Sequence, residues 1–393
     1  MKRLALFLAL LIAGTSSAAA APKSVVVKKL TIIATVSAEA MVVTGKTIIT
    51  ISNSDGLNSN ILLTGMDISG AQQWQKTIDS GVDEIALAAA VDPLGNVWLA
   101  GASSVIPVVE SATAPIQAEN PDGVIAEPVT KLRGDMNLLT LWKVSPLGDL
   151  LGTYTLAQSA PALINAISVN ASGVSIVGQL QDKPFVLSAT STGVFGKVIA
   201  IGTSKTALSA VVRHSDGSVS VFGSSAEILS GKKLAGVRDG VLIKISKTGA
   251  IASVVRSSAP KATRGWLAAD PSLTLTGYVK SGKVIETAFT KFTAAFAPTW
   301  TMRVPSLGTS TVLSAGNTTY GAFSSNSAVP GVIGWKPASA SVLLLTLDSK
   351  GVVSGAYGSS EIAEPISMAY SKELGVVGLA KTGAQTLSLF KLA

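Results

Sequence analysis

The sequence contains no cysteine, and this absence excludes several classes of site at once. A chain without cysteine has no disulfide framework, no thiolate metal site and no thiol for lipid attachment. It also contains a single histidine, His214, which leaves little scope for imidazole chemistry. The fold must therefore be held by its own hydrophobic core, for which 393 residues are ample.

Charged and aromatic residues are also scarce. They make up 14% and 5% of the chain, against 47% hydrophobic residues, and the net charge is +8. No basic run is interleaved with aromatic residues, so we expect no nucleic-acid partner. The excess of positive charge instead favours weak attraction to anionic surfaces such as envelope polymers. Abundant Ala, Val, Leu, Ser, Thr and Gly, with poor helix signals, favour short buried strands joined by small turns.

Long hydrophobic runs are missing everywhere except at the N-terminus. Lys2 and Arg3 precede an apolar stretch from Leu4 to Gly14, and small residues follow as far as Ala20. This layout predicts a secretory signal peptide over residues 1–20, cleaved near Ala20, with an uncleaved anchor as the alternative. Because no later segment approaches ~18 apolar residues, we expect no transmembrane segment after the signal. The sequence thus predicts a secreted or periplasmic protein.

Two short phrases recur along the chain. The first is a strand that ends in glycine, as in "NVWLAGASS", and its anchor positions are Ile51, Gly101, Gly178, Gly223, Gly277, Gly321 and Gly378. The second is a strand, a tight turn and another strand, and its turn positions are Gly70, Gly148, Gly193, Gly249, Phe296 and Gly351. Phe296 is assigned to the glycine position because Trp300 follows it by four residues, as Trp74 follows Gly70.

Each unit therefore holds four strands, a to d, with a mean period of about 54 residues, which is typical of a β-propeller. A two-sheet sandwich also has many short strands, but it does not predict repeated copies of one four-strand phrase. We therefore predict an all-β fold: one seven-bladed β-propeller of four-stranded blades over residues 21–393. The last blade lacks its fourth strand, and we expect Ser24–Lys29 to supply it beside the strand that ends at Leu392.

Three segments also resemble a bacterial β-propeller repeat often abbreviated SBBP. They are "IALAAAVDPLGNVWLAGASS", "GDMNLLTLWKVSPLGDLLG" and "VRDGVLIKISKTGAIAS". The match covers residues 61–104 well and 137–250 fairly, and the copies near Gly277 and Gly321 lack the family's "DxxGN" turn. The resemblance implies a seven-bladed extracellular propeller. It implies no activity, because propellers host many functions.

Length variation is concentrated in the b–c connections of blades two, four and six, which project from one face of a propeller. The blade-two connection is a Pro-rich acidic insertion at about residues 103–136. Insertions gathered on one face commonly mark a binding face. The alternative is that surface loops simply tolerate growth, and both interpretations stay open.

Six residues of these connections are candidate binding residues. Lys232, Lys233 and Arg238 lie in blade four, Trp335 and Lys336 in blade six, and Arg133 in the blade-two insertion. An aromatic ring beside cations suits a sugar ring or an anionic polymer. The competing interpretations are that Trp335 fixes its own loop and that Arg133, in an Arg-Gly-Asp tripeptide, belongs to the turn that starts strand c.

Catalytic and metal-binding patterns are weak. His214, Ser215 and Asp216 are adjacent on one turn and so cannot form a triad, which needs a base that reaches its nucleophile with a third group behind it. Asp92, Asp216 and Asp270 recur singly at a–b turns, where aspartate binds its own backbone. We expect no catalytic residues, no metal and no cofactor.

Taken together, these patterns favour a secreted, monomeric, non-enzymatic propeller. Its partner would be a protein or an envelope polymer or glycan, bound on the face of the blade-two, -four and -six b–c loops. The alternatives are a propeller enzyme acting on polysaccharide, as a lyase or hydrolase, and a purely structural or adhesive repeat protein.

Overall fold

The computed structural model describes residues 24–54, 59–105, 132–258, 260–382 and 386–392. The predicted signal peptide, residues 1–20, and most of the predicted insertion at 103–136 lie outside these residues. The described chain consists of strands and turns, β1 to β30. No helix in the described ranges is long and apolar enough to cross a membrane.

Six sheets are four-stranded blades. Three of them follow one another from the N-terminal side: β3 (Ala40–Thr44), β4 (Thr47–Asn53), β5 (Ile61–Met66) and β6 (Gln72–Ile78); β7 (Glu84–Val91), β8 (Val97–Ser103), β9 (Leu138–Val144) and β10 (Leu150–Ala157); β11 (Ala162–Asn170), β12 (Gly173–Leu180), β13 (Lys183–Ala189) and β14 (Ile199–Ala200).

The other three blades come from the second half of the chain and from one N-terminal strand. They are β15 (Thr206–Arg213), β16 (Val219–Ser225), β17 (Asp239–Ile245) and β18 (Ile251–Ser257); β19 (Thr263–Ala269), β20 (Thr274–Ser281), β21 (Val284–Phe292) and β22 (Pro298–Pro305); β28 (Glu364–Ser371), β29 (Gly375–Lys381), β30 (Leu387–Lys391) and β2 (Thr31–Val36).

The remaining sheet has six strands. Its order is β23 (Ser310–Ala315), β24 (Thr318–Ser325), β26 (Ser341–Leu347), β27 (Val353–Ser359), β1 (Val25–Lys29) and β25 (Val332–Ile333). The structure thus has six four-stranded blades, and the prediction of seven such blades is wrong. The sequence pattern did not indicate that β1 and β25 extend the outer edge of this sheet. β1 runs parallel to both β27 and β25.

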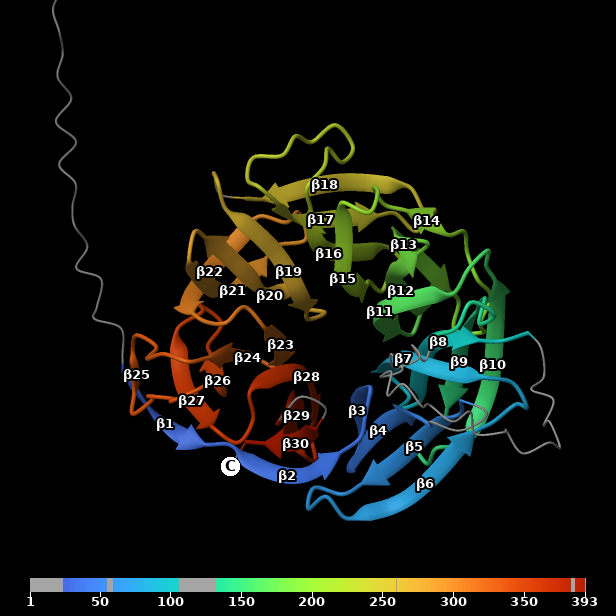
Figure 1. The fold of residues 1–393 in the computed structure, drawn as a ribbon, viewed down its shortest axis with the longest axis horizontal. Helices are drawn as coiled ribbons and strands as arrows, with labels where there is room; N and C mark the ends of the chain where they lie inside the picture. Colours follow the sequence, from blue (N-terminus) through green and yellow to red (C-terminus); the bar gives the residue numbers. More distant parts are fainter. Residues whose placement is uncertain (1–23, 55–58, 106–131, 259, 383–385, 393) are drawn as a thin grey trace, which may run out of the picture.

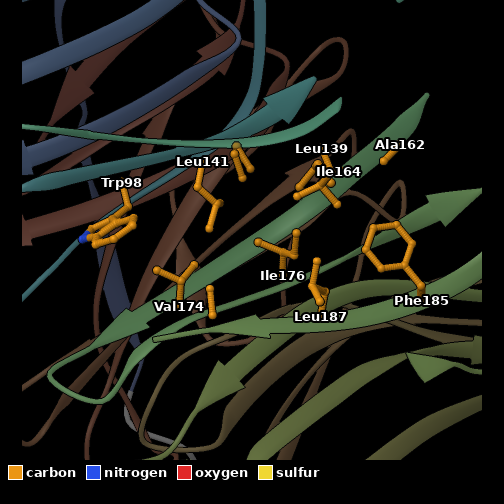
Figure 2. Close-up of a cluster of buried hydrophobic side chains, with 12 residues drawn as sticks. Trp98, Leu139, Leu141, Ala162, Ile164, Val174, Ile176, Phe185 and Leu187 are labelled. Carbon is orange, nitrogen blue, oxygen red and sulfur yellow. The ribbon is translucent and has the colours of Figure 1, made fainter. Parts of the chain in front are cut away.

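The sheets form a ring (Figure 1). Their first strands lie nearest the centre and contact one another in turn, from β3 to β7, β11, β15, β19, β23 and β28, and β28 contacts β3 again. The hydrophobic core lies between neighbouring sheets rather than in the middle of the ring. Figure 2 shows one such layer, in which Trp98, Leu141, Ile164, Val174 and Phe185 pack between the β7–β10 and β11–β14 blades.

The ring closes through β2, not through the strand that the sequence predicted. Residues Thr31–Val36 pair antiparallel with β30, and they complete the blade of β28, β29 and β30. The predicted closing segment, Ser24–Lys29, contains β1, which pairs with β27 of the six-stranded sheet instead. Leu30, fully buried, joins the two strands and donates its N–H to the Gly358 carbonyl.

Four anchor glycines of the b strands are required by bulges in the neighbouring a strands, whereas a Cβ on Gly321 or Gly378 would instead meet the ring of Phe289 or Phe390. The β7–β8 register shifts between Ala86 and Ala88, and a Cβ on Gly101 would lie 1.8 Å from the Ile85 carbonyl oxygen. Equivalent shifts lie beside Gly178, Gly223 and Gly277. The β3–β4 pair has no shift, which explains why Ile51 fits at its anchor.

We expect Gly101→Ala to destabilise the protein by about 3 kcal/mol or more, because the added methyl group meets rigid backbone rather than a mobile side chain. Gly134→Ala is the control: nothing lies within 4 Å of a Cβ there and its φ is not positive. Denaturant unfolding measures the difference. Equal midpoints for the two variants would show that strand β7 yields to the methyl group.

The c–d turns are the second repeated device, and the structure confirms their predicted positions. Gly70, Gly148, Gly193, Gly249 and Gly351 all have φ between 79° and 86°, and Phe296 occupies the same position with φ of 61°. Large side chains of outer strands cover the turn glycine of the next sheet. Virtual Cβ atoms on Gly148, Gly193 and Gly351 would lie within 2.6 Å of Trp74, Tyr154 and Trp300. These contacts fix each sheet against its neighbour.

Candidate functional site

The six candidate residues lie in the b–c connections of three different sheets. Arg133 precedes β9, the segment Lys232–Arg238 precedes β17, and Trp335 and Lys336 follow β25. The β11–β14 blade lies between the first two places and the β19–β22 blade between the last two, as their order around the ring in Figure 1 shows. The structure therefore does not bring the six residues into one site.

Arg133 serves the structure of its own loop. Its guanidinium forms ion pairs with Asp83, whose side chain is fully buried, and with Asp135. The hydrogen bonds that Arg133 donates to these two carboxylates raise its pKa, and they lower the pKa of Asp135. Asp83 also accepts the Ser59 N–H. Through Asp83, Arg133 therefore links the segment before β9 to the segments before β5 and β7. This geometry supports the turn interpretation of the Arg-Gly-Asp tripeptide.

The β16–β17 connection is held by a buried ion pair that the sequence did not indicate. Arg256 of β18 lies 3.3 Å from Asp239, and both side chains are almost fully buried. Asp239 also accepts the N–H groups of Ala235 and Gly236, while Arg256 donates to the Lys232 carbonyl at 3.1 Å.

The predicted cations of this connection have different roles. Arg238 donates to the Lys205 carbonyl at 3.1 Å and to Ser224 Oγ at 3.2 Å. Its guanidinium is thereby tied to its own blade. Lys232 and Lys233 are exposed at the loop tip and present two positive charges to solvent.

Trp335 and Lys336 lie at a pocket of about 320 Å³ at the outer edge of the six-stranded sheet. The pocket is lined from three directions, by β1, by the segment after β25 and by the end of β27 with the next residue: Val27, Lys28, Lys29, Gly334, Trp335, Lys336, Pro337, Gly358, Ser359 and Ser360. Three lysines thus surround it, and no carboxylate is among these lining residues. We call it the lysine pocket.

Trp335 forms the apolar wall of the lysine pocket. Its side chain is 7% exposed and belongs to the same buried cluster as Val332 and Ala356. The ring lies over Gly358, where a Cβ would come within 2.2 Å of it. The indole nitrogen is buried and has no hydrogen-bond acceptor among the described residues. Trp335 therefore does fix its own loop, and it lines the pocket as well.

The lysines of the pocket are only partly neutralised. Lys29 lies 3.0 Å from Glu361, and both side chains are largely exposed, so this pair contributes little stability. Lys28 lies over the ring of Tyr357, 5.7 Å from its centroid. Lys336 is exposed at the rim. The site therefore presents excess positive charge beside an aromatic wall.

Lys28 and Lys29 were missed as site residues because their strand was assigned to another sheet. The sequence signal was present in the pair of lysines after an alternating valine run, "KSVVVKK". What the sequence could not show was that β1 lies beside β27, where Lys28 and Lys29 meet Trp335 and Lys336.

His214 lies in the turn between β15 and β16. Its Nε2 is 2.7 Å from Ser220 Oγ, and Ser220 is 1% exposed, so no substrate reaches that hydroxyl. Burial and Lys244 lower the pKa of His214 and outweigh the opposing effect of Asp216. The Asp216 carboxylate accepts hydrogen bonds from the N–H and hydroxyl of Ser218. The adjacent His-Ser-Asp residues therefore form a turn and not a triad.

The other turn aspartates behave in the same way. Asp92 accepts the N–H groups of Leu94 and Asn96, and Asp270 accepts that of Ser272. Within the part of the chain that the structure describes, no group of three or more His, Cys, Asp or Glu residues could hold a metal ion.

Comparison with known proteins adds the following findings. No protein-family model matches the chain, so the predicted kinship with the SBBP repeat is unconfirmed, and no curated protein matches its sequence. Among solved structures, the chain is similar to the WD40 domain of Toxoplasma gondii coronin. The identity is 10%, the match covers 94% of this chain and 88% of that one, and the TM-score is 0.49.

Two prokaryotic structures are similar to a comparable extent. The β-propeller domain of the Trilobed protease from Pyrococcus furiosus is 10% identical, with 93% and 95% of the two chains covered and a TM-score of 0.47. An uncharacterized protein from Listeria monocytogenes is 12% identical, with 91% and 92% covered and the same TM-score. At these identities the likenesses concern the fold alone, and the sheet order and the closed ring of inner strands establish this chain as an all-β propeller.

Proposed function

We propose that this protein is an exported, non-enzymatic binding protein whose propeller holds an acidic envelope glycan at the lysine pocket. The observation that carries the proposal is the convergence of Lys28, Lys29 and Lys336 on the wall formed by Trp335, with no carboxylate lining the pocket. The signal peptide predicted over residues 1–20 supports a partner outside the cytoplasmic membrane.

The chemistry of the pocket suits a polymer of acidic sugars. Ammonium groups attract carboxylates without demanding one fixed geometry, which suits a repeating chain better than a single small ligand. Trp335 is 7% exposed, so the apolar contact that it offers a sugar ring is limited to the part of the indole that lines the pocket. The pocket lies at the outer edge of the six-stranded sheet and its three lysines are exposed, which suits a polymer that lies along the surface.

The test compares two variants that lose the same charge on the same face. Lys28→Gln with Lys336→Gln removes two lysines from the lysine pocket, and Lys232→Gln with Lys233→Gln removes two exposed lysines from the β16–β17 connection. Binding to immobilised polygalacturonate is measured by interferometry, with dextran as the neutral control. We expect wild-type binding that weakens with salt, and a loss of about tenfold in the first variant only.

Equal losses in the two variants would show that net charge alone attracts the polymer. Loss only in the Lys232 and Lys233 variant would move the site to the β16–β17 connection. Binding of dextran as strong as that of polygalacturonate, or no binding of either, would contradict an acidic glycan. Melting curves of both variants verify that the fold is intact.

A further inference from the structure

A second cationic site lies on the opposite face of the ring, where the a–b and c–d turns project. We call this face the turn face. Three clefts between neighbouring sheets open on it: one of about 300 Å³ between the β7–β10 and β11–β14 blades, one of about 150 Å³ between the β11–β14 and β15–β18 blades, and one of about 150 Å³ between the β19–β22 blade and the six-stranded sheet.

The middle cleft differs from the other two in its charge. The first cleft is lined by Lys143 together with Asp92, and the third by Lys291 together with Asp348. The middle cleft is lined by Lys197, Arg213 and Lys247, with no carboxylate among its lining residues. Three positive charges without a negative one in the same cleft create a positive potential that attracts an anion.

The c–d turns of two other sheets supply a carboxylate, at two different turn positions, and the turn at the middle cleft has one at neither. Between the β3–β6 and β7–β10 blades, Lys76 of an outer strand lies 3.2 Å from Asp149, which follows the c–d turn glycine. In the six-stranded sheet the c–d turn begins with Asp348. The c–d turn of the β15–β18 blade is Ser246-Lys247-Thr248-Gly249, followed by Ala250. It thus has serine where Asp348 stands and alanine where Asp149 stands, and its Lys247 lines the cleft together with Lys197.

Arg213 is the fixed member of the middle cleft. Its Nε donates to Ser172 Oγ at 2.8 Å, and one terminal nitrogen donates to Ser175 Oγ and to the Val174 carbonyl. The other terminal nitrogen, Nη2, donates to the Ser172 carbonyl at 3.0 Å.

These contacts leave one N–H of Nη2 without an acceptor among the described residues. The same nitrogen lies 4.0 Å from the position that a Cβ on Gly217 would take, at the wall of the cleft. Arg213 is half-buried and has no carboxylate partner, and this desolvation lowers its pKa.

The other groups near the cleft do not neutralise it. Asp216 precedes the lining residue Gly217 and keeps its charge, but it does not line the cleft and forms no ion pair with Arg213, Lys197 or Lys247 among the described residues. The hydroxyls of Ser246 and Thr248 lie 2.9 Å apart at the lining turn, and because one donates to the other, one O–H of the pair is left to donate to a ligand. The site therefore offers one oriented guanidinium, two mobile ammonium groups and one hydroxyl donor.

We propose that this cleft, the Arg213 cleft, binds a small doubly charged oxyanion of the phosphate type, either as the free ion or as a terminal phosphomonoester. Arginine supplies directed hydrogen bonds to such an oxyanion, and lysines add point charges around it. The volume of the cleft is about 150 Å³, several times the volume of about 30 Å³ that one water molecule occupies, so a phosphate ion has room in it. The site is separate from the lysine pocket and shares no residue with it.

Calorimetric titration with inorganic phosphate tests the site, at constant ionic strength maintained with sodium chloride. Lys197→Gln with Lys247→Gln removes both exposed lysines and leaves Arg213 with its contacts, so the fold is preserved. The matched control is Lys46→Gln with Lys350→Gln, two exposed turn lysines outside the Arg213 cleft. We expect one saturable site in the wild type, at least about tenfold weaker binding in the first variant, and unchanged binding in the control.

Glycerol 3-phosphate distinguishes the two sources of the anion. Binding of phosphate alone would assign the site to the free ion, and binding of both would assign it to a terminal phosphomonoester. No saturable heat with either ligand, or equal weakening in the two double variants, would overturn the proposal. Because neither variant alters the lysine pocket, the glycan experiment and this one can fail independently.

Discussion

A variant that begins at Ser37, and so lacks both β1 and β2, is expected to lose cooperative folding. Without β2, β30 becomes an open edge, and Ile32, Ile33 and Val36 no longer pack against two buried clusters. The loss of these side chains and of the strand pairing amounts to about 5 kcal/mol or more, a large part of the 5–15 kcal/mol typical of a whole domain. Thermal unfolding followed by circular dichroism measures the effect.

The control for this experiment is a variant that begins at Leu30, which lacks β1 but keeps β2. It should unfold cooperatively with a smaller loss of stability, because β1 only extends the outer edge of the six-stranded sheet. Amide exchange in Leu387–Lys391 should stay slow in this variant and become fast in the variant that begins at Ser37. If both truncations accelerated that exchange equally, β2 would not be the closing strand.

Asp239→Ala should be among the most destabilising single substitutions, with an expected loss of about 3–5 kcal/mol. The change leaves the buried guanidinium of Arg256 without its carboxylate, and it removes the acceptor of the Ala235 and Gly236 N–H groups. The free energy of unfolding, from denaturant titration, measures the loss. Asp239→Asn keeps one acceptor oxygen and should lie between the wild type and Asp239→Ala.

Asp135→Ala is the matched control, because Asp135 lies shortly before the c strand β9, much as Asp239 begins the c strand β17, and it also pairs with an arginine. That pair is roughly 40% exposed on both sides, and Arg133 retains Asp83, so we expect a loss below about 1 kcal/mol. If Asp135→Ala lowered the free energy of unfolding as much as Asp239→Ala, burial would not explain the difference expected between the two ion pairs.

Local features of the fold could be predicted from the sequence because residues a few positions apart determine them. The tight turns need a positive φ, and the spacing of Trp300 behind Phe296 was sufficient to identify the one turn without glycine. The anchor glycines were predicted as sites of close approach, and the structure shows that the approaching group is the carbonyl of a bulged neighbouring strand at four of them and a phenylalanine ring at Gly321 and Gly378. Both signals lie within a single four-strand unit.

The joining of the chain ends could not be predicted in the same way, because it depends on the lengths of one strand and one turn. β3 has five residues and a two-residue loop before β4, whereas β7 has eight residues and a five-residue loop before β8. The segment before Ile51 is therefore shorter than in other blades. Counting back from Ile51 by the spacing of those blades led to β1, instead of β2, as the strand that closes the ring.

The tertiary structure alone decided the composition of the candidate sites. Lys28 meets Trp335 only because β1 pairs with β27, and Lys197 faces Lys247 only because two blades are neighbours in the ring. The sequence by itself determined the all-β repeat, the turns and the excess of positive charge. The pairing and packing of strands far apart in the sequence decided which of those charges lie close together. The charge of a side chain does not indicate which distant strand will lie beside its own strand.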